Sequence, residues 1–181
     1  MNLHTMENSP LEKEVKILST RVEELLPKLR ALHAVDLGVE IQTNIVLDFP
    51  DRPLSKGDYF RIRSFENSNR PVEVTYKSLA SREDMRTSSE TTMLVTSQDD
   101  ALKVFRRLGM IVVHRGVKKR HSFSLMGARL DFDQWLSAGY PEPYLEIEVE
   151  SDVTLQEVLT ALDLTDREIS LLSISQLIQQ R

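Results

Sequence analysis

The chain has 181 residues, of which 40% are hydrophobic and 28% are charged, and its net charge is −5. This composition is typical of a folded protein of one domain, and the negative charge gives no general attraction to nucleic acid or anionic membranes. The absence of cysteine excludes disulfides, thiolate metal sites and cysteine nucleophiles, and no stretch is long and apolar enough to predict a membrane-spanning helix or a signal peptide.

The first half of the chain is predicted to contain five strands and one helix. Residues 11–18 alternate between polar and apolar side chains, which predicts a strand. Residues 20–33 have apolar side chains at helical spacing, Thr20 and Glu23 predict a capping box, and Pro27 predicts a kink or a late start. Further strands are predicted at residues 39–48, 58–66, 71–78 and 85–96, with a turn-rich segment at residues 50–57.

The second half is predicted to begin with a helix that Ser97 caps and Gly109 ends. Three more strands follow, and Gly116 is expected to introduce a bulge into the first of them. Thr154 with Glu157 predicts one more capped helix, and Thr165 with Glu168 predicts another. These strands span residues 110–125, 128–135 and 143–151. The total is about eight strands, with helices after the first, the fifth and the last.

Seven of the predicted strands share one feature, because polar and charged residues occupy one face of each. In the first strand, Glu12, Glu14 and Lys16 lie opposite Val15 and Ile17. The other polar faces comprise Arg61 and Arg63; Glu73, Thr75 and Lys77; Arg86, Ser88 and Glu90; Lys118 and Arg120; Arg129, Asp131 and Asp133; and Glu146, Glu148 and Glu150.

A sheet with one solvated face is the simplest explanation for any single strand. The pattern in seven strands favours a binding surface, since like charges two residues apart repel unless something bridges them. A ligand that carries both positive and negative charge, such as a metal–polyphosphate complex, can pair with both the acidic and the basic residues of such a face. Carboxylates are the ligands that Mg²⁺ prefers, and arginine binds phosphate oxygens bidentately. About eight strands can close into a barrel that holds one small ligand.

Six landmarks in the chain occur in the order found in a known family. They are Glu12-Lys13-Glu14-Val15-Lys16, residues 42–50 followed by Tyr59-Phe60-Arg61-Ile62-Arg63, Val74-Thr75-Tyr76-Lys77, the helix end at residues 105–110, Lys118-Lys119-Arg120 with Phe123, and the acidic strands Leu130-Asp131 and Leu145-Glu146-Ile147-Glu148. Over residues 11–178 the sequence resembles the CYTH superfamily, the triphosphate tunnel metalloenzymes.

This resemblance implies an α+β fold in which eight antiparallel strands form a closed barrel, the triphosphate tunnel, with helices packed outside. It also implies metal-dependent chemistry on triphosphates with Mg²⁺ or Mn²⁺. Known activities of the family are those of inorganic triphosphatase, thiamine triphosphatase, RNA 5′-triphosphatase and class IV adenylate cyclase. We expect residues 1–10 to form a flexible tail and residues 11–181 to form a single domain of a cytoplasmic protein.

With the resemblance, roles can be assigned to the charged faces. The catalytic residues are predicted to be Glu12, Glu14, Lys16, Glu146 and Glu148. The four glutamates among them are predicted metal ligands, directly or through water, together with Asp131. The predicted phosphate cradle consists of Lys16, Arg61, Arg63, Lys77, Lys118 and Arg120. Arg86 and Glu90 share the face of the fifth strand, and Arg129 could join the cradle or pair with Asp131. The alternative for each carboxylate is an exposed position on a strand, and we expect clustered carboxylates to repel one another when metal is absent.

Two features depart from the family pattern. Many relatives carry a Lys-Ser-Tyr or Ser-Tyr element in the last helix, where this chain has Leu172-Ser173-Ile174, and this weakens a thiamine triphosphatase assignment. Asn44 and Val46 stand where many relatives have an acidic and an aromatic residue.

The sequence therefore predicts a metal-dependent triphosphatase that acts on inorganic triphosphate or a nucleoside triphosphate such as ATP. A class IV adenylate cyclase, which forms cyclic AMP and pyrophosphate, is the alternative. A non-catalytic binder of phosphorylated ligands ranks last, because all four glutamates are present. The expected partner is a small-molecule triphosphate; membrane and disulfide-linked partners are not expected, nucleic acid is disfavoured, and an oligomer is left open.

Overall fold

The computed structural model describes residues 11–180, so the tail predicted at residues 1–10 lies outside the described residues. The strands are β1 (Leu11–Leu18), β2 (Val35–Asp48), β3 (Tyr59–Phe65), β4 (Val72–Arg82), β5 (Arg86–Val95), β6 (Ile111–Leu125), β7 (Ala128–Ser137), β8 (Tyr144–Val149) and β9 (Ile169–Ser170). The helices are α1 (Val22–Ala31), α2 (Gln98–Arg107), α3 (Asp152–Ala161) and α4 (Ile174–Gln179). None of the described helices has both the length and the apolar character needed to cross a lipid bilayer.

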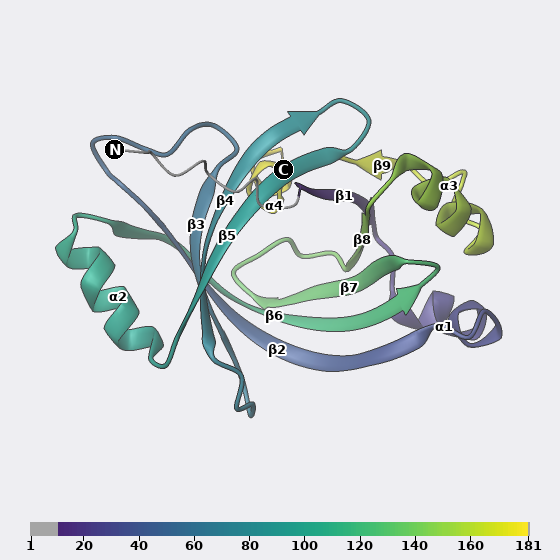
Figure 1. Ribbon diagram of the computed structural model, residues 1–181, viewed down its shortest axis with the longest axis horizontal. Helices are drawn as coiled ribbons and strands as arrows, with labels where there is room; N and C mark the ends of the chain where they lie inside the picture. Colours follow the sequence, from purple (N-terminus) through teal and green to yellow (C-terminus); the bar gives the residue numbers. More distant parts are fainter. Residues whose placement is uncertain (1–10, 181) are drawn as a thin grey trace, which may run out of the picture.

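The sheet closes into an antiparallel barrel through β1 (Figure 1). Strands β5-β4-β3-β2-β6-β7-β8-β1 follow one another around the barrel. β1 pairs with β8 along one edge, and its residues Leu11–Glu14 pair with β5 along the other edge. The predicted closed barrel of eight antiparallel strands is therefore confirmed, and β9 is one short strand beyond the prediction.

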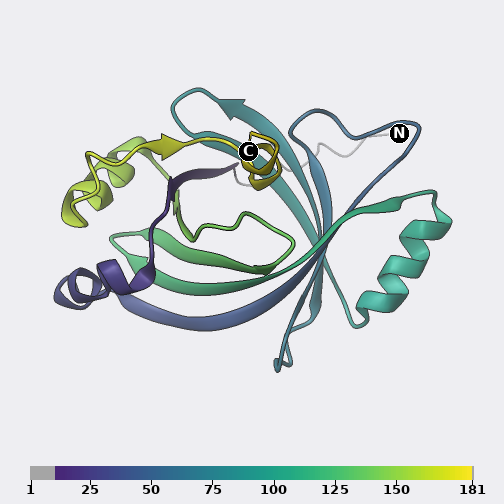
Figure 2. The ribbon, with the colours of Figure 1, turned by 180° about the vertical axis from the view of Figure 1, so that it is seen from behind.

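Apolar side chains of the strands point outward and lie beneath the helices. Leu25 and Leu29 of α1 and Leu155 and Val158 of α3 pack on the outward faces of β1, β6, β7 and β8. A second cluster forms where Leu102 of α2 packs on β2, β3 and β4. Figures 1 and 2 show α2 on one side of the molecule and α1 and α3 on the opposite side. Because the helices cover the outer surface, the polar face of each strand is turned toward the inside of the barrel.

The capping boxes predicted at Thr20 and Thr154 are absent, and no helix begins at Thr165. Thr20 Oγ1 donates to the carbonyl oxygen of Leu18 at 3.2 Å, and α1 begins after Arg21 without a side-chain cap. At α3 the cap is Ser151, whose hydroxyl accepts from the amide of Thr154 at 3.2 Å, so Thr154 lies inside the first turn. Ser97 caps α2 as predicted, through the amide of Asp100.

The last predicted helix is divided into two elements. Ile169 and Ser170 stay extended and pair with Ile17 and Lys16, on the edge of β1 that β5 leaves open beyond Glu14. This pairing satisfies backbone groups that would otherwise be unpaired, which explains why the helical pattern is overridden there. α4 then begins after Ser173, which forms a capping box with Gln176.

Gly116 does not form the predicted bulge. It pairs in regular register with Asn44 of β2. The irregularities nearby lie between His114 and Val112 in the pairing with β2 and between Val117 and Lys118 in the pairing with β7. A Cβ atom at Gly116 would lie 2.7 Å from the ring of Trp135 and 2.9 Å or less from two carbonyl oxygens. The glycine therefore makes room for Trp135.

Candidate active site

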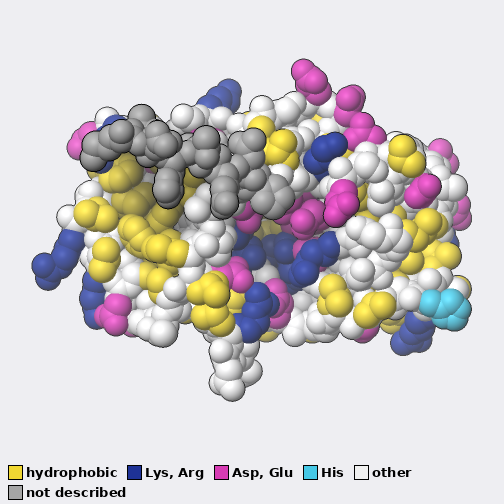
Figure 3. Space-filling model, viewed as in Figure 1, with side chains coloured by type: hydrophobic (Ala, Val, Ile, Leu, Met, Phe, Trp, Pro, Cys, Tyr) yellow, Lys and Arg dark blue, Asp and Glu magenta, His cyan; other side chains and the backbone are white. Residues whose placement is uncertain are grey.

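The polar face of the barrel is shielded from solvent although it is rich in charge. Glu14 is 8% exposed, Lys16 3%, Lys77 4% and Arg86 2%. The other buried polar residues of the strands are Gln42, Asn44, Thr75, Ser88, Lys118, Arg120, Ser122, Asp131 and Asp133. Buried charges are costly unless they are paired, so the arrangement of these pairs defines the site. Lys and Arg side chains (dark blue) and Asp and Glu side chains (magenta) also gather near the centre of the face shown in Figure 3.

Glu14 of β1 is the centre of one network. Its carboxylate lies 2.9 Å from Lys16 Nζ, 3.2 Å from Lys77 Nζ and 3.3 Å from Arg86 Nε. Lys16 also binds Glu146, at 3.0 Å. Burial alone would raise the pKa of Glu14, but Lys16 and Lys77 outweigh burial and hold this pKa below its usual value. Glu14 is therefore ionised in the metal-free protein and compensates several cations.

Arg120 of β6 is the centre of a second network. Its guanidinium donates to Asp131 at 2.5 Å, to both oxygens of Asp133 at 2.7 Å and to Glu146 at 2.7 Å. Lys118 donates to Asp133 at 2.6 Å. Asp133 thus holds two predicted cradle residues in place. It shares the polar face of its strand, but the alternation alone gave it no role, because its cationic partners come from another strand.

The cations of β3 and β6 are not fully balanced by anions. Arg63 Nε donates to the amide oxygen of Asn44 at 2.9 Å, and its contact with a carboxylate of Glu73 is 3.9 Å long. Burial, together with the charges of Arg61 and Arg120, lowers the pKa of Arg63 to about 10. Burial and Arg120 also lower the pKa of Lys118 to about 8, although Asp133 opposes this shift. This side of the barrel holds an excess of positive charge.

Carboxylates are in excess near the ends of β1 and β8. Burial raises the pKa of Glu12 to about 7; Glu14 and Glu90 add to the rise, and Lys77 opposes it. Burial and Asp131 raise the pKa of Glu148, and the Glu148 carboxylate has no hydrogen bond or ion pair within residues 11–180. A cavity of about 370 Å³ opens here and is lined by Leu11, Glu12, Glu90, Gly127, Arg129, Glu148, Val149 and Glu150.

The remaining sequence-predicted residues lie in these surroundings. Lys77 contacts Glu12 and Glu90 as well as Glu14. Arg129 pairs with Asp131 at 3.0 Å, and its side chain is 44% exposed. The structure thus brings the predicted cradle and the predicted carboxylates into one barrel. Their roles in binding and catalysis stay predictions.

Comparison with known proteins identifies the fold family. The family model described as "CYTH domain" matches residues 10–178, which is nearly the whole chain. The chain belongs to the CYTH family. Members of this family are triphosphatases or adenylate cyclases, which agrees with the resemblance seen in the sequence. No curated protein sequence matches the chain.

Solved CYTH-like structures share the fold at low sequence identity. The PH1012 protein from Pyrococcus horikoshii OT3 has a TM-score of 0.77 and 22% identity, covering 92% of this chain and 98% of that one. A putative adenylate cyclase from Vibrio parahaemolyticus has a TM-score of 0.72 and 16% identity, over 94% and 99% of the two chains. The putative adenylyl cyclase HpAC1 from Hippeastrum, described as having a dominant triphosphatase activity, has a TM-score of 0.69 and 15% identity, over 93% and 95%.

The carboxylates of this CYTH chain supply the oxygen ligands that a hard divalent cation such as Mg²⁺ prefers. Glu14 and Glu148 lie directly opposite each other on β1 and β8, and Glu12 lies two residues from Glu14 on the same face. Burial is the main cause of the raised pKa values of Glu12 and Glu148, and neighbouring carboxylates add to the rise. Within residues 11–180, however, no three carboxylates or histidines already converge as a metal site, since Glu14 is bound by lysines.

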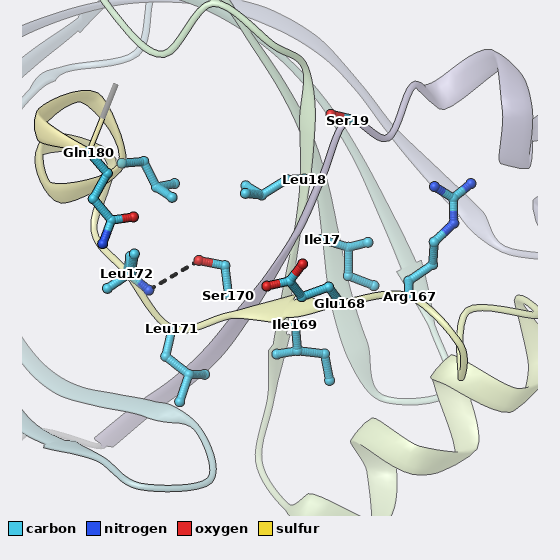
Figure 4. Close-up of a pocket in the computed structure, with 11 residues that line it drawn as sticks. Ile17, Leu18, Ser19, Arg167, Glu168, Ile169, Ser170, Leu171, Leu172 and Gln180 are labelled. Carbon is cyan, nitrogen blue, oxygen red and sulfur yellow. Dashed lines mark hydrogen bonds between the residues drawn. The ribbon is translucent and has the colours of Figure 1, made fainter.

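A larger cavity of about 490 Å³ lies between the end of β1 and the segment that contains β9 and α4 (Figure 4). Ile17, Leu18 and Leu172 line it, and Leu172 donates its amide to Ser170 Oγ at 3.4 Å. Among the described residues that line it, Arg167 and Glu168 are the charged ones. Four or more phosphate charges could not be balanced there, so the barrel is the better candidate site.

Proposed function

We propose that this CYTH protein is a divalent-metal-dependent enzyme that acts on a triphosphate inside the barrel, and that it hydrolyses inorganic triphosphate or a nucleoside triphosphate. The observation that carries the proposal is the separation of charge in the barrel. Burial and neighbouring cations lower the pKa values of Arg63 and Lys118, and burial and neighbouring carboxylates raise those of Glu12 and Glu148. In a triphosphate with a bound divalent cation, the phosphate oxygens would pair with the cations and the metal would pair with the carboxylates.

The phosphate oxygens would be bound on the side of β3 and β6. Arg61 Nε is shielded from solvent and has no hydrogen-bond partner within the described residues, so it has a donor to offer. Arg63 has only an amide and a long ion pair. Lys118 and Arg120 are kept in place by Asp133, and a phosphate would share their donors. Charge-assisted contacts of this kind are strong where water is excluded.

Enzymes of this family generally depend on divalent metal ions. In this chain Glu12, Glu14 and Glu148 would hold Mg²⁺ or Mn²⁺, with Glu146 and Asp131 as further oxygen donors. When bound, the metal supplies positive charge to the phosphate oxygens and polarises the attacking oxygen. Lys16 and Lys77 would orient these carboxylates through the contacts that they already make with Glu14.

In hydrolysis, water attacks the terminal phosphorus, the bond from that phosphorus to the bridging oxygen breaks, and diphosphate or the nucleoside diphosphate leaves. The cradle would stabilise the charge on the oxygens of the transferred group. In cyclisation, the ribose 3′-hydroxyl attacks the α-phosphorus and pyrophosphate leaves. The same charged residues would serve both reactions, so hydrolysis and cyclisation must be distinguished by their products.

The test supplies inorganic triphosphate, ATP and thiamine triphosphate in turn with Mg²⁺ or Mn²⁺ and identifies the products. Release of orthophosphate from inorganic triphosphate or ATP is the expected result. If ATP instead gives cyclic AMP and pyrophosphate, the protein is an adenylate cyclase and not a hydrolase. If the protein binds triphosphate tightly but forms no product, it is a non-catalytic binder.

A further inference from the structure

Arg82 and Arg86 form a pair of cations where β4 turns into β5. They are directly opposite each other in the register of the two strands. Both guanidinium groups reach Gly57: Arg86 Nη2 donates to its carbonyl oxygen at 3.4 Å, and Arg82 Nη2 lies 3.2 Å from the position that a Cβ atom would take there. The two groups therefore meet at one point in the fold.

Most of the buried side-chain polar atoms that lack a hydrogen bond within the described residues lie at this point. Seven buried side-chain polar atoms within residues 11–180 lack a hydrogen bond, and five of them are Arg82 Nε and Nη2, Arg86 Nε and Nη1, and Ser88 Oγ. Ser88 is two residues from Arg86 on the same face of β5 and is fully buried. Arg86 Nε is 3.3 Å from Glu14 Oε1, and the other four atoms have no partner within the described residues. Buried donors without partners are costly, so this cluster points to a ligand that supplies acceptors.

The protein's own carboxylates do not balance this pair. Glu14 Oε1 lies 3.3 Å from Arg86 Nε, but Glu14 also contacts Lys16 and Lys77. Arg82 has no ion pair within the described part of the chain. Burial and the charge of Arg86 lower the pKa of Arg82, as expected for two like charges side by side.

We propose that Arg82, Arg86 and Ser88 form a second anion-binding site, separate from the row of Arg61, Arg63, Lys118 and Arg120, and that it takes a phosphate-type tetrahedral oxyanion. Two guanidinium groups and a hydroxyl present more donors than the two oxygens of a carboxylate can accept, whereas phosphate has enough oxygens and enough charge. The oxyanion is either free orthophosphate or the end phosphate of a longer chain that already lies in the barrel. The site goes beyond the proposed function, because it can be occupied whether or not the protein turns over a triphosphate.

The direct test is anomalous diffraction from metal-free crystals soaked in tungstate, a heavy analogue of phosphate. A peak within hydrogen-bond distance of Arg82 and Arg86 is expected, and it should vanish in Arg82→Gln and persist in Arg106→Gln, a matched change of an exposed arginine on α2. The absence of that peak from the wild-type protein, or its persistence in Arg82→Gln, would overturn the proposal.

Binding in solution identifies the source of the oxyanion. Calorimetric titration with orthophosphate, and separately with inorganic triphosphate, compares the wild-type protein with Arg82→Gln and Arg82→Lys. A loss of about tenfold or more in Arg82→Gln, which Arg82→Lys partly restores, is expected for one of the two ligands. If Arg82→Gln loses affinity for orthophosphate, the site binds the free ion. If it loses affinity for triphosphate alone, the site binds the end phosphate of the longer chain. Unchanged affinity for both ligands would contradict the proposal. Thermal melting of both variants checks that they are folded.

Discussion

Arg63 illustrates how much of the proposed chemistry depends on single side chains. The residue is on the inward face of β3, next to Arg61 on the same face, with the apolar Ile62 pointing outward between them. Its planar guanidinium can grip two phosphate oxygens at once, which an ammonium group cannot do.

We expect Arg63→Lys to lower kcat/KM for the best triphosphate substrate by about tenfold or more, because lysine keeps the charge but cannot donate two parallel hydrogen bonds to a phosphate. Lys119→Ala, an exposed change on the other face of β6, should have little effect. The measurement is kcat/KM for both variants at two salt concentrations. Equal, small and strongly salt-screened effects would indicate a solvated basic patch instead.

Lys118 should set an upper pH limit for activity. Its pKa of about 8 means that the ammonium is charged at pH 7 and becomes neutral as the pH rises through 8, so it then no longer attracts phosphate. We expect kcat/KM, which reports the free enzyme, to fall above about pH 8. In Lys118→Arg the fall should move to higher pH, and identical profiles for the two proteins would exclude Lys118 as its cause.

Glu14 and Glu148 should respond in opposite ways to neutralisation. The sequence suggested mutual repulsion for all the clustered carboxylates, but the structure corrects this for Glu14, which contacts Lys16, Lys77 and Arg86. Glu14→Gln leaves those cations uncompensated and should destabilise the metal-free protein by about 3 kcal/mol. Glu148, whose pKa is raised, should tolerate Glu148→Gln with an unchanged or higher Tm.

Both substitutions should reduce turnover with Mg²⁺ or Mn²⁺, and the loss should reach about a hundredfold for Glu14→Gln. Thermal melting without metal and steady-state kinetics with saturating metal measure the two effects. Near-normal turnover of Glu14→Gln would remove Glu14 from the site, and a lower Tm for Glu148→Gln would contradict the excess of carboxylates around it.

At the scale of elements, the side chain of Trp135 packs between β6 and β7, which also pair as antiparallel strands. The ring of Trp135 lies against Gly116, and Gly139 is so close to it that a Cβ atom there would be 2.1 Å from the ring. Trp135 Nε1 donates to the hydroxyl of Tyr144 at 3.3 Å. These contacts connect β6, β7 and β8 near Lys118.

Gly116→Ala should therefore lower the Tm by several degrees, since overpacking costs about 1–3 kcal/mol and each kcal/mol is worth about 2–4 °C in a chain of this size. The fluorescence of Trp135, the only tryptophan, should change with it. Val113→Ala, at an exposed position of the same strand, is the control and should leave both nearly unchanged. A Gly116→Ala protein with wild-type Tm would show that the neighbours move aside freely.

Strand alternation predicted the barrel lining well because it depends only on local sequence: the pattern that puts Glu12 and Glu14 opposite Val15 holds in the structure. Local signals failed where distant segments decided the outcome. Ile169 and Ser170 are extended because the edge of β1 is open, and Asp133 acquires its partners from β6. Which carboxylate binds which cation depends on the register between strands, and a single sequence does not contain that register.

For the whole molecule, closure of the barrel is what converts seven charged strand faces into one candidate site. The helices and their apolar clusters cover the outside, so the charges face one another instead of water. The charges interact strongly only because the barrel is closed: on an open sheet, water and salt would screen the same charges and leave their pKa values near the ordinary ones.

The most direct test is anomalous diffraction from crystals grown with Mn²⁺ and a non-hydrolysable triphosphate analogue. We expect Mn²⁺ inside the barrel among Glu12, Glu14 and Glu148, and phosphorus atoms toward Arg61 and Arg63. Mn²⁺ or the triphosphate bound only on the outer surface, with the barrel lining unchanged, would contradict the account.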